Sequence, residues 1–216
     1  MSYEKSFLTE LAKDSSDGYG RPKRLKSDYY FKENDSQVSK PWRPRVNHPQ
    51  VKELIGAFKK QSTMIAGGAI LGCLEALEFG DIDVFPLDAT ALENCDSILE
   101  ELGYKMESQL PYSRMYLHQQ SAYRHVQVLT IHTDVKDGWQ LLRRFDLSCA
   151  QVGVLNGNLL SFTHSLQDIR KRTLRVCGTL SIKSLLDRLE KYQKRGFKFY
   201  DDDNSETKKV LKKNNG

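Results

Sequence analysis

Residues Ser62–Asp88, STMIAGGAILGCLEALEFGDIDVFPLD, predict a strand, a glycine turn, a helix and a second strand in close succession. Thr63–Ala66 is a short apolar run of the kind that forms a buried strand. Gly67 and Gly68 interrupt that strand, and Ala69–Glu78 then carries leucine and isoleucine at helical spacing. The rest of the chain is arranged around this strand, turn and helix.

The second strand, Asp81–Phe85, presents two carboxylates on one face. Because side chains alternate along a strand, Asp81 and Asp83 share one face while Ile82 and Val84 share the other. Carboxylates so placed can bridge hard divalent cations, and backbone amides at a glycine turn that opens a helix can hold phosphates. The pattern therefore favours a site for a metal-bound polyphosphate.

These features resemble the nucleotidyltransferase superfamily, which includes DNA polymerase β, poly(A) polymerases and CCA-adding enzymes. The matching pieces are the GG turn, the Asp-x-Asp strand and a later lone acid, for which Asp146 in RRFDLSCAQVGV is the candidate. Similarity to smaller viral and cellular members lies in FDLSCAQVGVLNG, DIRKRTLRV and LDRLEKYQKRGF, so the match covers roughly residues 60–197. Many members carry serine after the glycines, whereas Ala69 stands here and leaves phosphate contacts to backbone amides.

The resemblance implies a template-independent enzyme that transfers a nucleoside monophosphate from a nucleoside triphosphate such as ATP to a hydroxyl acceptor. It implies two Mg²⁺ (or Mn²⁺) ions, with Asp81 and Asp83 binding both. Asp146 would be a further ligand of the ion that activates the attacking hydroxyl, and it would accept the proton of that hydroxyl. Gly67 and Gly68 would let the triphosphate approach closely. The basic residues that the resemblance places near the triphosphate or the acceptor are Arg170, Arg172, Lys191 and Arg195.

Asp146 is expected on the polar face of a short strand. In this segment Phe145 and Leu147 alternate with Asp146 and Ser148, so we expect both polar side chains to be exposed. The preceding apolar strand, Tyr123–His132, can lie beside the Asp-x-Asp strand. Such a neighbour would bring Asp146 into the same cleft as the other two acids.

Charge is distributed unevenly along the chain, whose formal net charge is +5. Residues 61–108 hold ten acids and one base, whereas residues 164–216 hold fourteen bases and seven acids. The acidic block surrounds the predicted metal site, and the basic block suits a polyphosphate or an RNA backbone. Solvation of helix faces by lysine and arginine is the alternative, which we favour for the terminal KKVLKKNNG.

Composition indicates a globular chain without a membrane span. Of the 216 residues 39% are apolar, and the mean hydropathy of −0.57 leaves no apolar run long enough to cross a bilayer. The N-terminus lacks the apolar region of a secretory signal, so we expect a cytoplasmic protein. Four widely spaced cysteines are expected as buried thiols: Cys73, Cys95, Cys149 and Cys177.

Further elements follow from periodicity and capping patterns. Expected helices are His48–Lys60 capped by Asn47, Ala89–Leu102 capped by Asp88, one from Thr133 or Asp134 to Leu142, His164–Arg172 capped by Thr163, and one starting at Ser181. Expected strands are Tyr104–Met106 and Arg114–His118, with a hairpin over Gln151–Phe162 that turns at Asn156-Gly157.

We therefore predict an α+β nucleotidyltransferase fold, with a mixed β-sheet flanked by helices. The expected parts are a polar N-terminal arm (1–47), a catalytic core (48–162), a basic helical extension (163–200) and a charged tail (201–216).

Three function classes stay open. The first is nucleotidyl transfer to an RNA 3′ end or a smaller acceptor. The second is the same chemistry on a protein hydroxyl or a small molecule, and the third is a non-catalytic nucleic-acid-binding module. No G-x-x-x-x-G-K-[ST] or G-x-S-x-G motif is present, which disfavours a P-loop ATPase and a serine hydrolase.

Overall fold

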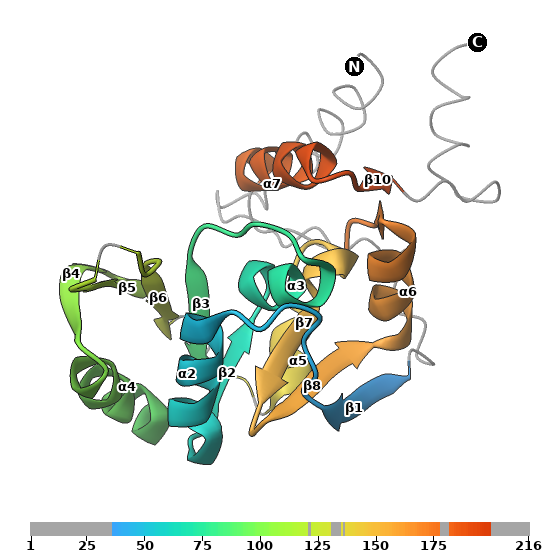
Figure 1. The fold of residues 1–216 in the computed structure, drawn as a ribbon. Coiled ribbons are helices and arrows are strands. Elements are labelled where there is room, and N and C mark those ends of the chain that lie inside the picture. Colours follow the sequence, from blue (N-terminus) through green and yellow to red (C-terminus); the bar gives the residue numbers. More distant parts are fainter. Residues whose placement is uncertain (1–35, 121, 131–134, 136, 178–181, 200–216) are drawn as a thin grey trace, which may run out of the picture.

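A computed structural model describes residues 36–120, 122–130, 135, 137–177 and 182–199 (Figure 1). Most of the expected N-terminal arm, the expected tail and the expected helix start at Thr133 or Asp134 lie outside these residues. Within them the chain forms a mixed sheet with helices on both faces, so the predicted α+β fold class is confirmed.

Eight strands form one sheet in the order β1-β8-β7-β2-β3-β6-β5-β4. Neighbouring strands are antiparallel except β3 and β6, which run parallel. The strands are β1 (Gln37–Pro41), β2 (Thr63–Ala66), β3 (Ile82–Pro86), β4 (Tyr104–Leu110), β5 (Ser113–His118), β6 (Val126–Leu129), β7 (Val152–Leu155) and β8 (Asn158–Phe162). A separate parallel pair joins β9 (Thr173–Leu174) to β10 (Lys198–Phe199).

Six α-helices and two 3₁₀ turns connect the strands of the described part. The helices are α2 (Pro49–Ala57), α3 (Gly68–Glu75), α4 (Ala89–Glu101), α5 (Gly138–Leu142), α6 (Thr163–Lys171) and α7 (Ile182–Lys194). The turns are η1 (Phe58–Lys60) and η3 (Ser148–Ala150). None of the helices in this part is both long enough and apolar enough to span a membrane.

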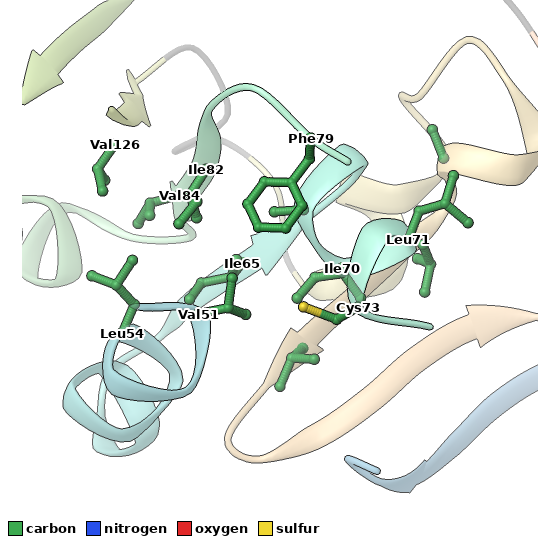
Figure 2. Close-up of a cluster of buried hydrophobic side chains, with 14 of the residues drawn as sticks. Val51, Leu54, Ile65, Ile70, Leu71, Cys73, Phe79, Ile82, Val84 and Val126 are labelled. Atoms are coloured by element: carbon green, nitrogen blue, oxygen red, sulfur yellow. The ribbon is translucent and has the colours of Figure 1, made fainter. Parts of the chain in front are cut away.

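The larger part of the core lies on the face of the sheet that α2, α3 and α4 cover. Ile65 of β2 and Val84 of β3 are completely buried there, and Val126 of β6 continues the apolar surface. Figure 2 shows Val51 and Leu54 of α2 packed against these strands. Burial of such side chains stabilises the fold by about 1.5–3 kcal/mol each.

A second cluster lies on the opposite face, under α5. Phe85 of β3 and Phe162 of β8 pack there with Leu141 and Leu142 of α5. Because side chains alternate along β3, Asp83 lies on the same face as Phe85. The Asp83 carboxylate therefore points away from the larger core, whereas Asp81 lies one residue before β3, outside the strand that was predicted to include it.

Several local predictions are confirmed. Strand β2 has the predicted bounds, and Asp88 caps α4, with its Oδ1 accepting a hydrogen bond from the Ala91 amide at 2.7 Å. The predicted hairpin turns at Asn156 and Gly157, whose φ angles of 52° and 76° are both positive. Two positive φ angles in succession are typical of the turn that matches the twist of a hairpin.

Several helix ends and caps were predicted wrongly, including α2, which ends at Ala57 and is followed by the 3₁₀ turn η1. The helix after the glycines ends at Glu75, because Ala76 adopts a left-handed φ of 55° and its amide bonds back to Gly72. His48, not Asn47, occupies the N-cap position of α2. Thr163 is the first residue of α6, and its Oγ1 donates to the carbonyl of Ser36 at 3.1 Å.

Candidate active site

The glycine turn places the start of α3 at the edge of the Asp-x-Asp strand. Gly67 has φ 76° and ψ −133°, a conformation that residues with a side chain rarely adopt. Its amide donates to the Val152 carbonyl at 2.8 Å, which ties the turn to β7. A Cβ at Gly68 would have no heavy atom within 4 Å, so the backbone there is open to a ligand. The first amides of α3 lack carbonyl partners within the helix and suit an anion.

Asp83 lies directly against this turn. Strand register pairs it with Ala66, the residue before Gly67, and its Oδ2 is 3.9 Å from where a Cβ would stand on Gly67. Burial first, and then the negative charge of Asp81, raise the pKa of Asp83 to about 7. An acid with such a raised pKa is stabilised in its ionised form by a nearby cation.

Phe145, the neighbour of Asp146, lies on the same side of the sheet as Asp83. The Phe145 ring lies 5.6 Å, centroid to centroid, from the ring of Phe85 on β3. Its Cε1 is also 3.0 Å from the Cβ position of Gly67. The residue before Asp146 therefore contacts both the Asp-x-Asp strand and the glycine turn.

The local structure around Asp146 differs from the prediction. Asp146 is 5% exposed and Ser148 is fully buried, although both were expected on a solvent-facing strand. The segment pairs with the chain at Cys177, whose amide donates to the Asp146 carbonyl at 2.6 Å, and Leu147 forms an isolated bridge with Val176. That second segment covers Asp146, and the chain then turns into η3 instead of continuing as a strand.

Helix α7 brings two cations to the acids. Arg188 forms an ion pair with Asp146 through Nη1 and Oδ2. Burial raises the pKa of Asp146, and the charge of Arg188 opposes that rise. Lys191, one turn further along α7, and Arg188 also oppose the raised pKa of Asp83. Both cations therefore favour the ionised form of Asp83, and Arg188 also favours that of Asp146.

The four basic residues predicted to reach the nucleotide occupy different places. Lys191 acts on Asp83, as described above. Arg172 instead lies at the far end of α3, where its Nη2 is 3.2 Å from Glu75 Oε2. The guanidinium of Arg195 lies 5.5 Å from the Tyr192 ring centroid, at the C-terminal end of α7. Arg170 is exposed on α6. Lys191 is therefore near enough for its charge to lower the pKa of Asp83, whereas Arg172 pairs with Glu75 elsewhere.

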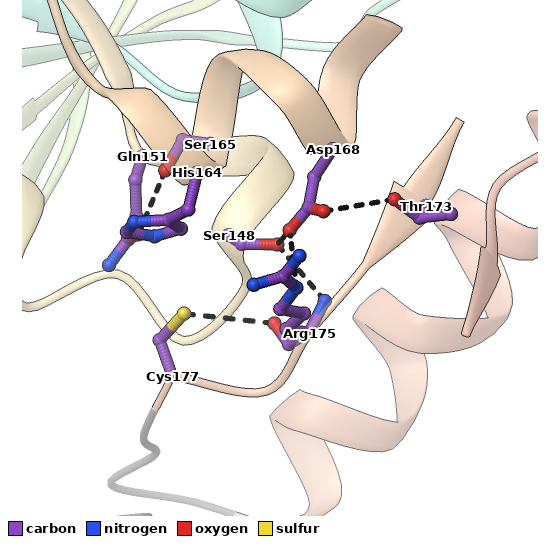
Figure 3. A network of polar contacts seen from close by, with 8 residues as sticks. All are labelled: Ser148, Gln151, His164, Ser165, Asp168, Thr173, Arg175 and Cys177. Carbon is purple, nitrogen blue, oxygen red and sulfur yellow. Dashed lines mark hydrogen bonds and ion pairs between the residues drawn. The ribbon is translucent and has the colours of Figure 1, made fainter. Parts of the chain in front are cut away.

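A buried polar network supports the segment that carries Asp146 (Figure 3). Asp168 of α6 is completely buried and accepts hydrogen bonds from Ser148 Oγ at 2.6 Å and Thr173 Oγ1 at 2.9 Å. Its Oδ2 also lies 3.2 Å from Nε of Arg175. The Arg175 amide donates back to Ser148 Oγ at 3.0 Å. These contacts hold residues 146–148 against residues 175–177.

Two residues of this region were not selected from the sequence, Arg188 and Asp168. Arg188 is one of several cations in its helix, and nothing in the sequence distinguishes it from Lys183, Lys191 or Lys194. Asp168 lies within DIRKRTLR, a segment in which Arg170 and Arg172 were selected from the sequence as nucleotide-binding residues. In the sequence Asp168 is a lone acid among four cations, a pattern that does not indicate a buried carboxylate.

The residues fit a divalent metal ion by donor chemistry, since carboxylate oxygens are the ligands that Mg²⁺ and Mn²⁺ prefer. In the part of the chain that the structure describes, no group of three or more acidic, histidine or cysteine side chains is assembled so that it could hold a metal ion. Asp146 is paired with Arg188 instead. Asp81 and Asp83 would therefore hold an ion first, and Arg188 would compete with it for Asp146.

Comparison with known proteins supports the fold. No protein-family model and no curated protein matches the chain. Among solved structures, the Thermotoga maritima CCA-adding enzyme complexed with tRNA superimposes with a TM-score of 0.59 and 17% identity, covering 81% of this chain and 46% of that one. The fold is therefore a nucleotidyltransferase fold like that of the CCA-adding enzymes.

Two other solved structures give the same result. A CCA-adding enzyme in complex with CTP matches with a TM-score of 0.56 and 15% identity, covering 77% of this chain and 44% of that one. A tRNA-processing enzyme in its apo form matches with a TM-score of 0.57 and 16% identity, covering 79% and 48%. The chain thus spans less than half the length of these neighbours.

Proposed function

We propose that the chain is a metal-dependent, template-independent nucleotidyltransferase. The observation that carries the proposal is the meeting of the glycine turn, Asp83 and the Phe145-Asp146 segment on one side of the sheet. Residues 67, 83 and 146 are distant in sequence, yet Phe145 contacts the turn and the Asp-x-Asp strand together. The nucleotidyltransferase fold supports the same reading.

In this proposal the amides at Gly67, Gly68 and the start of α3 bind the triphosphate of a nucleoside triphosphate. An acceptor hydroxyl attacks the α-phosphorus, a new P–O bond forms, and the bond to the β-phosphate oxygen breaks to release pyrophosphate. Asp81, Asp83 and Asp146 would hold two divalent cations, which would stabilise the attacking and leaving oxygens. Asp146, whose pKa burial raises, accepts the hydroxyl proton.

An RNA 3′ end is the acceptor that we propose first. The structural neighbours include one complexed with tRNA and others complexed with CTP or with ATP. Exposed cations at the C-terminal end of α6, Arg170 and Lys171, offer contacts for a phosphate backbone. A protein hydroxyl or a small molecule is the competing acceptor for the same chemistry, and the experiment distinguishes these acceptors.

The test is pyrophosphate release from purified protein with Mg²⁺ or Mn²⁺ and each of the four labelled nucleoside triphosphates. Reactions contain total RNA, protein, or no added acceptor, and the labelled product identifies the acceptor. We expect wild-type protein to release pyrophosphate and to label RNA. Asp83→Asn should reduce the rate by at least a thousandfold, about 4 kcal/mol in activation free energy, because it removes the central metal ligand.

Asp88→Asn is the matched control. It removes the same charge from the segment after β3, and asparagine is an N-cap as good as aspartate. This variant should keep wild-type activity and stability. Equal pyrophosphate release by wild type and Asp83→Asn would refute the catalytic proposal and favour a non-catalytic binding module.

A further inference from the structure

Arg188 of α7 contacts Asp146 directly. Its Nη1 pairs with Asp146 Oδ2, and its charge also acts on Asp83. The two partners differ in exposure, since the side chain of Arg188 is 52% exposed and that of Asp146 is 7% exposed. Asp146 is therefore fixed in the protein, while the guanidinium lies on the solvent side.

The solvent-exposed partner of such an ion pair can move to another anion at a low cost in free energy. Exposed ion pairs contribute about 0–1 kcal/mol, so the guanidinium can leave Asp146 for a stronger anion. It cannot leave without a replacement cation, because an ionised carboxylate that is buried and unpaired is strongly destabilised. A divalent ion at Asp146 would supply that replacement. We therefore expect the Arg188–Asp146 ion pair to separate when metal and nucleotide bind together.

The arriving nucleotide offers the guanidinium a new partner. Lys191 lies one turn from Arg188, so α7 presents two cations beside the acids. A triphosphate bound at the start of α3 would carry its negative charge next to these cations. Arginine matches phosphate through two parallel hydrogen bonds, which makes it the better partner of the two for a phosphate group.

We propose that Arg188 exchanges partners, pairing with Asp146 before the nucleotide binds and with the triphosphate afterwards. The inference rests on the proposed function and adds a residue that the sequence patterns did not single out. It predicts that loss of Arg188 changes metal affinity and nucleotide affinity in opposite directions. Removing Arg188 should strengthen metal binding to the free protein, because a competitor is lost, and should weaken nucleotide binding, because a phosphate ligand is lost.

The metal arm measures Mn²⁺ binding without nucleotide, from the electron paramagnetic resonance signal of free Mn²⁺. Arg188→Ala should bind Mn²⁺ about two- to fivefold more tightly than wild type, the factor that corresponds to losing an exposed ion pair. Lys194→Ala is the matched control, since it removes one cation from the same helix and Lys194 pairs with Glu190, not with the site. It should leave Mn²⁺ affinity close to wild type.

The nucleotide arm measures binding of the α,β-methylene analogues of ATP and CTP in Mg²⁺, which cannot release pyrophosphate. Arg188→Ala should bind the better analogue about tenfold more weakly, as expected for loss of a charge-assisted bond. Arg188→Lys should keep wild-type Mn²⁺ affinity and show an intermediate nucleotide affinity, because lysine keeps the charge without the planar fork.

The outcomes separate the two proposals. If wild type binds Mn²⁺ and an analogue but Arg188→Ala matches it in both, the exchange is refuted and the proposed function stands. Weaker binding of both ligands by Arg188→Ala would show a purely supporting role and also refute the exchange. If wild type binds neither ligand, the proposed function and the exchange fail together.

Discussion

Gly67 and Gly68 are adjacent, yet the structure constrains them differently. Gly67 combines a positive φ of 76° with the Phe145 ring 3.0 Å from its Cβ position. Gly68 has open space at the same point. The first glycine is therefore needed to build the site, whereas the second keeps the start of α3 accessible.

This difference predicts opposite effects of two alanine substitutions. Gly67→Ala should lower the free energy of unfolding by about 2 kcal/mol, because the backbone strain adds to the contact with Phe145. Gly68→Ala should be neutral or slightly stabilising, since alanine favours the helix by up to about 1 kcal/mol. It should still weaken nucleotide binding by crowding the phosphates. Urea unfolding and binding of a triphosphate analogue measure the two effects, and similar stability loss in both variants would contradict the assignment.

Asp83 predicts an unusual dependence of stability on pH in metal-free protein. Its pKa of about 7 lies above the ordinary value of 3.8, so the folded state holds a proton that the unfolded state has lost between these values. The free energy of unfolding therefore falls as pH rises through that window. Asp83→Asn removes this penalty and should be more stable than wild type at pH 8 by about 4 kcal/mol.

The same comparison at pH 5 is the control for Asp83. The folded wild-type carboxyl is then mostly protonated and resembles the amide, while the unfolded carboxyl is still largely ionised, so the advantage of the variant should be less than half of its value at pH 8. Thermal unfolding in a chelating buffer at both pH values measures the difference. A constant difference at both values would show that Asp83 titrates in the ordinary range.

At the scale of single elements, α4 is the helix whose start depends on one side chain. Asp88 Oδ1 accepts from the Ala91 amide at 2.7 Å, and hydrogen bonds to backbone amides, Ala91 first, lower the pKa of Asp88. Asp88→Ala should cost about 1 kcal/mol at pH 7, the usual cost of losing such a cap. A lowered pKa gives stability that is present above the ordinary value and lost as pH falls through the folded value. The cost measured by thermal unfolding should therefore shrink in strong acid, and an unchanged cost there would contradict the cap.

Elements that depend on local chemistry could be predicted from the sequence. The bounds of β2, the Asp88 cap and the turn at Asn156-Gly157 each follow from a few neighbouring residues. The end of the helix after the glycines could not be predicted in this way. It depends on a left-handed residue at Ala76, where alanine gives no signal of the kind that glycine would.

The candidate site was predictable only in part, because only some of its residues depend on their neighbours in sequence. Asp81 and Asp83 follow from a local pattern of alternation. The environment of Asp146 depends on partners far along the chain, since Arg188 is 42 residues away and residues 175–177 cover its backbone. Sequence periodicity describes the face of an element, but it does not say which distant segment will cover that face.

At the scale of the whole molecule, Asp168 connects the sheet to the segment that leads to α7. The carboxylate is completely buried and joins Ser148 beside the site to Arg175 on the way to α7. Breaking a buried ion pair by removing one partner costs about 3–5 kcal/mol, because the other charge stays buried. Asp168→Asn should therefore destabilise the protein by about 3 kcal/mol in urea unfolding.

Thr173→Val tests the same network with its charges intact. It removes one neutral donor, the 2.9 Å bond to Asp168, and should cost only about 1 kcal/mol. Because Asp168 holds Ser148, two residues after Asp146, Asp168→Asn should also lose metal and nucleotide affinity under conditions where it is still folded. Thr173→Val should keep both affinities. If Asp168→Asn were destabilised yet bound metal and nucleotide as wild type does, the network would support the fold without positioning Asp146 or Arg188.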